Sequence, residues 1–472
     1  MSKKVLAFDF GASSGRAMLA AYSGGKITME EIHRFSNDPV EVNGVLYWDI
    51  LRLFFEVKQA INKAALAGGF DAIGIDTWGV DFGLIAKDGS LLQNPVHYRD
   101  ARTENIMDEA FEVVAKEEIY RRTGLQFMRF NTLFQLYYLQ KYRPELLERT
   151  HKMLFIPDLI AYFLTGEMSA EYTIASTSQM LCANTGEWDL ELLNMFSFPT
   201  DILPDIKQPG EVYGTLLPAI CEELGCKSVP VISVCSHDTG SAVAAVPSLE
   251  RDFIYVSCGT WSLFGTELKR PHISRRSSDL QITNEGGYGK SIRFLKNITG
   301  LWLLQESRRQ WRREGLELSF AEIERLAREV PADKFVIDCS YPEFDKPGNM
   351  PERIKQYCRD NGLPVPDSVG EVAMAIYNGL SLKYKETLDM ISEITGINYP
   401  SIHLIGGGAK DSLLSQMTAD KCGVTVYAGP FEATVIGNII VQLIALKQIP
   451  DLKAARKIVS ESFDYFKYTP AN

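Results

Sequence analysis

The chain has 472 residues and a formal net charge of −11 at pH 7. That length predicts two or three domains, because one hydrophobic core rarely serves more than about 300 residues. Apolar residues make up 46% and charged residues 23%, as in an ordinary globular protein. The negative charge argues against nucleic acid or an anionic membrane as a partner, so an anionic ligand would need local donors or a metal ion.

Cysteine usage and the first apolar run indicate an intracellular protein. The eight cysteines form no Cys-x-x-Cys pair and the six histidines do not cluster near them, so a structural zinc site is not expected. Asp9 interrupts the first apolar run before the core of a signal peptide is complete, and no stretch reaches the about 18 apolar residues of a membrane span. We therefore expect a cytoplasmic protein with reduced thiols.

The first half of the chain predicts a β-rich start followed by helices. Short apolar runs separated by glycine turns are typical of a hairpin meander, and Asn43-Gly44 is a strong signal for a two-residue turn. The expected elements are, in order, strands at 4–10, 16–22 and 26–35, a hairpin around 43–44, a helix at 50–67, a strand at 70–75, and helical segments within 101–149 and near 157–164.

The second half repeats the opening pattern. A strand, a tight glycine turn and a returning strand occur at residue 9 and again at residue 257, which indicates an internal duplication with one hairpin opening each lobe. The further expected elements are strands at 252–257, 261–268 and 402–405, a charged, solvent-facing helix at 305–329, an amphipathic helix at 371–395 capped by Gly396, and helices at about 411–422 and 434–446.

The stretch from Val231 to Pro247 carries the strongest chemical signal. An apolar strand runs into His237, Asp238 and Thr239, and a small-residue helix follows. Asp238 is thereby predicted at a helix N-terminus, where exposed N–H groups and the helix dipole favour the ionised carboxylate. Such a carboxylate is suited to take a proton from a substrate hydroxyl. The alternative interpretation is that Asp238 or Thr239 only caps the helix.

Three glycine turns follow strands, at 11–15, 259–260 and 406–408. Each leaves backbone N–H groups free to face a phosphate, although most glycine turns are structural. Asp9 ends a buried strand before the first turn, so it predicts either a turn cap or a ligand of Mg²⁺ through water. A P-loop is excluded because Asn284 stands where its first glycine belongs, and the first turn leads into a strand, unlike a Rossmann turn.

Polar residues inside apolar stretches mark further candidates. The segment IGIDTWGVDF buries Asp76, Trp78 and Asp81 among apolar neighbours, and Trp78 is either a core residue or a wall for a sugar ring. Asn297 lies in a similar setting and must be hydrogen-bonded, while Gln305 ends that stretch.

Nine motifs in order along the chain resemble the FGGY carbohydrate kinases, and within that family the branch that acts on L-rhamnulose. They are DFGASSGR (9–16), GIDTWGVDFGL (74–84), HYRDART (97–103), SHDTGSAV (236–243), SCGTWSLFG (257–265), TNEGG (283–287), LKNITGLWLLQE (295–306), IGGGAKDSLLSQMTAD (405–420) and AGPFEATVIGN (428–438). The resemblance implies an α/β fold of two ribonuclease-H-like, actin-like ATPase lobes with a cleft between them. It implies a sugar-binding lobe at 1–247, with the first phosphate hairpin and the base, and a nucleotide-binding lobe at 248–472.

The resemblance also implies roles for individual residues. Asp238 would be the catalytic base, and Asp9 would serve Mg²⁺. The ATP-binding residues would be Ala12, Ser13, Ser14, Gly15, Arg16, Thr260, Gln305 and Gly407. The sugar-binding residues would be Gly79, His237, Asp238, Thr239 and Asn297. Many relatives carry a hydroxyl at position 12, but the rhamnulose branch resembles this sequence in having alanine there.

The implied reaction is transfer of the ATP γ-phosphoryl to the 1-hydroxyl of L-rhamnulose by a monomer or small homo-oligomer. Two alternatives remain. One is another kinase of the family, acting on fuculose, xylulose, glycerol or gluconate, because a few pocket contacts decide sugar preference. The other is a nucleotide-gated ATPase of the actin or Hsp70 kind, which would have no need of the 237–239 and Asn297 constellation.

Overall fold

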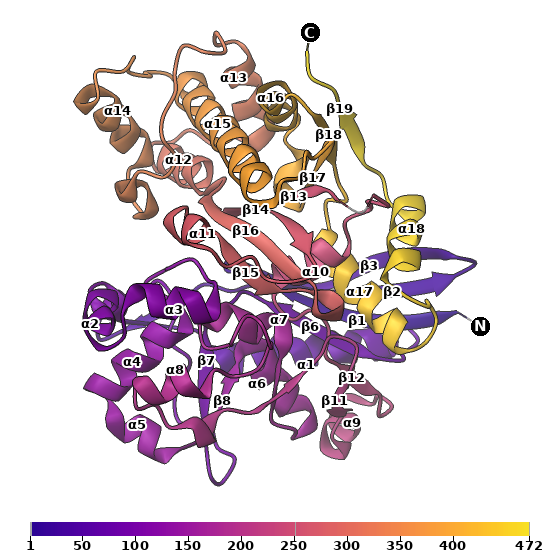
Figure 1. Cartoon of the computed structure of the whole chain (residues 1–472). Coiled ribbons are helices and arrows are strands. Elements are labelled where there is room, and N and C mark those ends of the chain that lie inside the picture. The colour runs from indigo at the N-terminus through magenta and orange to yellow at the C-terminus, as the bar shows by residue number, and fades with distance from the viewer. Residues whose placement is uncertain (1, 251, 472) are drawn as a thin grey trace. The chain divides into compact units, whose positions relative to one another are not determined.

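The computed structural model describes residues 2–250 and 252–471, and the chain forms two compact units (Figure 1). Unit 1 comprises residues 1–249, 268–294 and 434–462, and unit 2 comprises 250–267, 295–433 and 463–472. The predicted division into 1–247 and 248–472 stays a prediction. Two segments from the second half of the chain, 268–294 and 434–462, thus make most of their contacts within unit 1.

The main sheet of unit 1 has the strand order β11-β12-β6-β1-β2-β3. Its strands are β1 (Lys3–Phe10), β2 (Ser14–Ser23), β3 (Lys26–Ser36), β6 (Ile73–Thr77), β11 (Val212–Thr215) and β12 (Pro230–Ile232). β1 and β2 form the predicted hairpin, and β1, β6 and β12 run parallel to one another. The strand predicted at 70–75 lies two to three residues later, because its pairing with β1 continues to Thr77.

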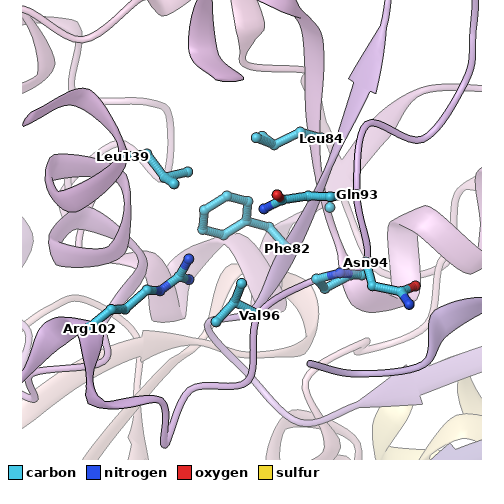
Figure 2. A pocket seen from close by; sticks show the side chains of 9 residues that line it. Phe82, Leu84, Gln93, Asn94, Val96, Arg102 and Leu139 are labelled. Atoms are coloured by element: carbon cyan, nitrogen blue, oxygen red, sulfur yellow. The ribbon is translucent and has the colours of Figure 1, made fainter. Parts of the chain in front are cut away.

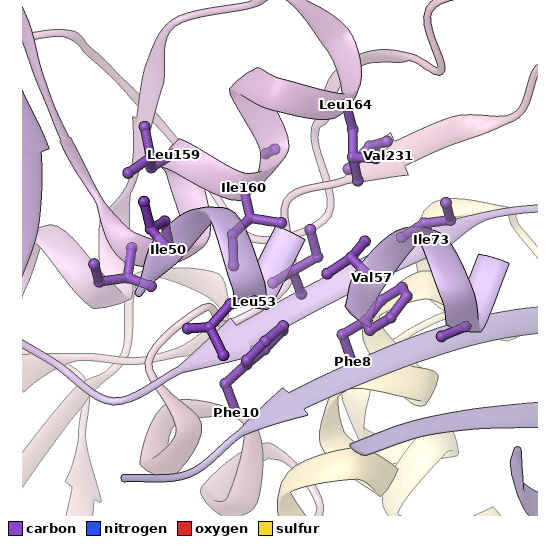
Figure 3. Packing of buried hydrophobic residues seen from close by; sticks show 14 of the residues in the cluster. Phe8, Phe10, Ile50, Leu53, Val57, Ile73, Leu159, Ile160, Leu164 and Val231 are labelled. Carbon is purple, nitrogen blue, oxygen red and sulfur yellow. The ribbon is translucent and has the colours of Figure 1, made fainter. Parts of the chain in front are cut away.

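Helix α1 (Ile50–Leu66) covers one face of this sheet (Figure 3). It begins where the Asp49 carboxylate accepts a hydrogen bond from the Arg52 N–H, and it buries residues at helical spacing such as Leu53 and Val57. These side chains belong to the same core cluster as Phe8 of β1 and Leu159 of α6 (Ile156–Thr165). The core thereby holds the strands whose ends carry the candidate site.

A second core lies around β7 (Phe82–Ala86) and β8 (Thr150–Phe155), beside helices α2 to α5 (Figure 1). The other helices of unit 1 are α2 (Ile106–Val113), α3 (Lys116–Thr123), α4 (Thr132–Tyr142), α5 (Pro144–Arg149), α7 (Tyr172–Ala175), α8 (Leu190–Met195), α9 (Pro218–Leu224), α10 (Asp238–Ala244), α11 (Arg275–Asp279), α17 (Ala433–Ala445) and α18 (Leu452–Ser462). Short pairs join β4 (Val40–Val42) to β5 (Val45–Tyr47) and β9 (Ser169–Glu171) to β10 (Asp205–Lys207). The predicted Asn43-Gly44 turn links the first pair, with positive φ at both residues.

The second main sheet has the order β15-β16-β14-β13-β17-β18-β19. Its strands are β13 (Ile254–Cys258), β14 (Trp261–Leu268), β15 (Thr283–Gly286), β16 (Ile292–Thr299), β17 (Ser401–Ile405), β18 (Thr425–Ala428) and β19 (Phe466–Tyr468). A first hairpin followed by parallel neighbours, β13-β17-β18, repeats the arrangement β1-β6-β12 of unit 1. The repeated strand order agrees with the predicted duplication.

The helices of unit 2 correct one expectation. A single solvent-facing helix was predicted at 305–329, but α12 (Trp302–Arg313) ends before Gly315, whose φ is 90°, and α13 (Phe320–Arg328) restarts at a Ser319 capping box. Helix α12 also buries Glu306 and Trp311, so it is not purely a surface helix. The remaining helices are α14 (Met350–Asp360), α15 (Val369–Thr395) and α16 (Ser412–Cys422). Within residues 2–250 and 252–471, none of the helices combines the length and apolar character that crossing a bilayer requires.

Candidate active site

Three acidic residues of unit 1 lie at or just beyond the carboxyl ends of parallel strands. The register pairs Asp9 of β1 with Asp76 of β6, and a bridge joins Thr77 to His237, one residue before Asp238. Because the carboxyl ends of parallel strands meet at one edge of a sheet, these side chains are brought together. That edge is the usual ligand-binding edge of such sheets.

The first glycine turn is a tight hairpin tip at the same edge. Gly11 N–H donates to the Ser14 carbonyl at 2.9 Å, and the Asn37 side chain donates to the Gly11 carbonyl at 2.9 Å. At Gly15 an added Cβ would lie 2.3 Å from the Phe35 ring, so a side chain does not fit there. Ala12 and Ser13 form the tip with Ser14, where β2 begins, and Arg16 lies on β2 opposite Asp9.

The carboxylates at this edge differ in their partners. Arg16 donates to Asp9 Oδ2 from Nε at 2.9 Å and from Nη2 at 2.8 Å. Asp76 is fully buried, and Asn438 donates to its Oδ2 at 2.7 Å. Burial, reinforced by the charges of Asp9 and Asp238, raises the pKa of Asp76 well above its usual value.

Asp238 is the first residue of α10, and His237 occupies the N-cap position, so the interpretation of Asp238 or Thr239 as a simple N-cap is wrong. Asp238 Oδ1 accepts from the Thr239 N–H at 2.5 Å and from the Thr239 hydroxyl at 3.1 Å. No hydrogen bond to Oδ2 is found among the described residues, and the side chain is 32% exposed. Burial, reinforced by the charge of Asp9, raises the pKa of Asp238. Oδ2 is therefore a reachable and relatively basic oxygen.

The loop after β6 carries Gly79 in a strained setting. Val80 has a φ of 68°, which is rare for a β-branched residue, and it is held by the Thr177 hydroxyl at its N–H and the Thr132 hydroxyl at its carbonyl. An added Cβ at Gly79 would lie 3.2 Å from Thr177 Oγ1. The loop therefore has little freedom to move.

Buried contacts of Asp81 and Trp78 also hold this loop in place. The Asp81 carboxylate accepts from the indoles of Trp48 and Trp78, from the Gln135 side chain and from the Tyr98 N–H. Burial nevertheless raises the pKa of Asp81 to about 6. Trp78 is 6% exposed, with its ring centre 4.0 Å from that of Trp48, which makes it a core residue rather than a wall for a sugar.

A pocket beside β7, lined in part by Phe82 and Leu84, is too small to hold a sugar or a nucleotide (Figure 2). Figure 2 shows Phe82, Leu84, Val96, Arg102 and Leu139 around it. The space holds about one water molecule. A cavity of about this size is a small packing defect at the second core.

Unit 2 gathers a second group of candidates at the ends of β13 and β17. These strands are parallel neighbours, so the turns at 259–260 and 406–408 lie side by side. The Thr260 hydroxyl donates to Gln305 Oε1 at 3.2 Å. Gly408 packs tightly, since an added Cβ would lie 2.3 Å from Cys258 Sγ, whereas Gly407 is exposed and faces open space. Asn297 lies half-buried on β16.

Sequence reasoning missed three residues around His237. Glu171 accepts hydrogen bonds from the N–H groups of Thr173, Ile174 and Ser236 and so fixes the turn before His237. Glu285 and Arg293 flank the His237 ring. Arg293 interrupts the apolar strand at 292–295, and that signal could have found it, as it found Asn297.

Two family profiles match almost the whole chain. The FGGY family of carbohydrate kinases, N-terminal domain, matches residues 4–245, and the C-terminal domain of the same family matches 254–446. A rhamnulokinase of Oceanobacillus iheyensis is 43% identical over 98% of this chain and 97% of its own length. A rhamnulokinase of Bacteroides thetaiotaomicron is 40% identical over 100% of this chain and 96% of its own length.

Solved structures share the fold at lower identity. A xylulose kinase from Lactobacillus acidophilus has a TM-score of 0.81 at 18% identity and covers 99% of this chain and 94% of its own. A gluconate kinase from the same species has a TM-score of 0.81 at 19% identity, covering 100% and 94%. The expected fold of two actin-like ATPase domains is confirmed. The chain therefore belongs to the FGGY family of carbohydrate kinases and is a sugar kinase enzyme.

Proposed function

We propose that the protein transfers the γ-phosphoryl group of ATP to the 1-hydroxyl of L-rhamnulose, giving L-rhamnulose 1-phosphate and ADP. The relatives named rhamnulokinase, at 40–43% identity over nearly the full chain, support this substrate. The observation that carries the chemistry is the geometry of Asp238, whose Oδ1 is held by Thr239 while Oδ2 makes no bond within the described residues.

In this proposal Asp238 Oδ2 accepts the proton of the 1-hydroxyl as that oxygen attacks the phosphorus. The bond from the γ-phosphorus to the bridging oxygen of ADP breaks, and the electron pair leaves with ADP. Because phosphoryl transfer has a loose transition state, positioning and charge stabilisation contribute most of the catalysis. His237, Thr239, Gly79 and Asn297 would hold the sugar.

The hairpin tip from Ala12 to Arg16 and the hydroxyl of Thr260 would hold the phosphates, and Gln305 and Gly407 would complete the nucleotide site. Backbone N–H groups of such turns bind phosphate oxygens closely because small residues keep the approach open. Alanine at position 12, which the rhamnulose branch resembles, leaves that position of the tip without the hydroxyl that many relatives carry.

The acidic edge of unit 1 suits Mg²⁺ chemically. Asp9, Asp76 and Asp238 repel one another, and an added cation would relieve that repulsion. In the part of the chain that the structure describes, no three His, Cys, Asp or Glu side chains converge as metal ligands. Asp9 would therefore hold the ion with water and substrate phosphates completing its shell, as Mg²⁺ prefers. When bound, the ion would neutralise charge on the phosphoryl oxygens.

ADP release by purified protein tests the function directly. Mg²⁺-ATP is supplied with L-rhamnulose, L-fuculose, D-xylulose, glycerol, D-gluconate or no sugar. We expect the highest kcat/KM with L-rhamnulose and little release without sugar. A higher kcat/KM with another sugar would show that L-rhamnulose is not the preferred substrate. Equal ADP release with and without sugar would overturn the proposal that ATP turnover phosphorylates a sugar.

Gly407→Val tests the nucleotide site in unit 2. Nothing lies within 4 Å of an added Cβ at Gly407, so the melting temperature should stay close to that of the wild type. If adenosine lies against this turn, the new side chain should raise the KM for ATP by about tenfold or more. The contrasting variant Gly408→Ala should lower the melting temperature, because its Cβ meets Cys258 Sγ. An unchanged KM for ATP in Gly407→Val would exclude Gly407 from the site.

The pH dependence tests the base. Asp238 must be ionised to accept a proton, and its pKa is raised by burial, so protonation removes activity at a higher pH than for an ordinary aspartate. We expect kcat/KM for L-rhamnulose to fall as the pH is lowered, with the midpoint above about 3.9. Purified protein is assayed in buffers of constant ionic strength after its stability at each pH has been checked. A midpoint at or below the ordinary value would contradict this assignment.

A further inference from the structure

Two buried charges lie behind the His237 ring in unit 1. Arg293 of β16 is fully buried, and Glu285 of β15 is 5% exposed. Burying an ion pair generally costs several kcal/mol, so such a pair adds little stability compared with apolar packing. Its position suggests a role in orienting its neighbour.

Arg293 is anchored and directed at His237. Its Nε donates to the Gly286 carbonyl at 2.7 Å, and its Nη2 lies 3.0 Å from His237 Nδ1 in hydrogen-bonding geometry. A guanidinium has five N–H donors and no acceptor, and it keeps its charge in proteins. His237 Nδ1 must therefore be the acceptor, which means that it carries no hydrogen.

Glu285 balances the charge without competing for the ring. Its Oε2 lies 3.0 Å from Arg293 Nη2 and 3.3 Å from His237 Nδ1, yet among the described residues it receives a directed hydrogen bond from neither. Burial would raise the pKa of Glu285, but the charge of Arg293 is the main cause that lowers it, which keeps the carboxylate ionised beside the guanidinium.

We propose that Arg293 is a positioning residue that fixes His237 as the neutral imidazole with its hydrogen on Nε2. His237 Nε2 lies 3.4 Å from Asp238 Oδ1, so the ring presents a donor next to the base. It then donates to an oxygen of the bound sugar and cannot itself take the hydroxyl proton, because Nε2 already carries hydrogen and Nδ1 is occupied. Proton acceptance falls to Asp238 alone. The sugar contact rests on the proposed function, but the tautomer does not.

The state of the ring can be measured without any mutation. Protein labelled with ¹⁵N at histidine is examined by long-range ¹H–¹⁵N NMR, with the His237 signals assigned by their loss in His237→Gln. We expect a protonated Nε2 and an unprotonated Nδ1 near neutral pH. A protonated Nδ1, whether in the other tautomer or in the imidazolium, overturns the proposal.

Variants test whether Arg293 sets that state. Arg293→Met should remove the preference for hydrogen on Nε2 and raise the KM for the sugar by about tenfold or more, with the KM for ATP changed less than about twofold. Arg293→Lys keeps the charge without the planar fork and should restore part of the effect. The matched control is Arg456→Met, since Arg456 donates to the carbonyls of Val243 and Ala244 at the other end of α10 and does not touch His237.

The outcomes separate the two proposals. An unchanged His237 tautomer in a folded Arg293→Met protein, judged by circular dichroism and melting, overturns the role of Arg293. If Arg293→Met does not fold, the His237 tautomer in Arg293→Lys, compared with that in the wild-type spectrum, tests the role of Arg293. A wild-type protein with hydrogen on Nε2 but no rhamnulose-dependent ADP release would overturn the proposed substrate and leave the tautomer assignment standing.

Discussion

Asp238→Asn is expected to lower kcat for sugar phosphorylation by about 10² to 10⁴ while the protein stays folded. The amide cannot accept the hydroxyl proton, yet it has the shape of the carboxylate and can keep the contacts with the Thr239 N–H and hydroxyl. The raised pKa of Asp238 means that the folded protein disfavours the charged form, so removing the charge should not lower stability at neutral pH. Steady-state ADP release and thermal unfolding measure the two effects.

The control for this variant is Asp88→Asn, in an exposed turn where the carboxylate accepts a hydrogen bond from the Ser90 hydroxyl; this variant should retain wild-type kcat. The KM for ATP should change little in Asp238→Asn, because the proposed role of Asp238 concerns the hydroxyl proton. A kcat within about threefold of the wild type would remove Asp238 as the base.

Gly437→Ala is expected to destabilise the protein by about 3 kcal/mol and to reduce kcat in whatever protein remains folded. Gly437 lies in α17, where an added Cβ would be 1.8 Å from the Ser241 carbonyl oxygen and 2.4 Å from its carbon. The obstructing atoms are backbone, so no side-chain rotation can relieve the overlap. Ser241 belongs to α10, which begins at Asp238, and displacing that helix moves the proposed base.

Gly423→Ala separates this overlap from the general cost of replacing a glycine. Gly423 caps α16 with a φ of 69° and has open space around it, so alanine there should cost only about 1 kcal/mol and leave kcat unchanged. Denaturant unfolding measured on both variants gives the comparison. Equal stability losses in the two variants would show that α10 and α17 can separate without harm.

Local signals in the sequence predicted the elements and the strand ends well. The meander at β1 to β3, the Asn43-Gly44 turn, α1 with its glycine stop and the Gly396 cap all depend on residues close together in the chain. The assignment of Asp238 to a helix start also needed only its neighbours. The failures came where distant contacts decide, as at 305–329, where a break at Gly315 and a buried face replace one exposed helix.

The supporting groups of the site were harder to predict for the same reason. Arg293 approaches His237 across 56 positions of the chain, and Asn438 reaches Asp76 across 362. Composition and periodicity describe one element at a time, so they reveal that a polar residue is buried but not which partner satisfies it. The resemblance of the motifs supplied the candidate residues, and the geometry supplied their neighbours.

Helix α17 is synthesised long after the strands of unit 1 that it contacts, which limits when unit 1 can complete its fold. Asn438 donates to Asp76 and to the Phe8 carbonyl, and Gln442 donates to the Leu6 carbonyl, so the central strands of unit 1 receive these partners from near the end of the sequence. During synthesis on the ribosome, the strands carrying Asp9 and Asp76 emerge more than 350 residues before the helix that satisfies them. The acidic edge therefore cannot assemble fully until residue 438 has been synthesised, and products truncated before that residue will lack this partner of Asp76.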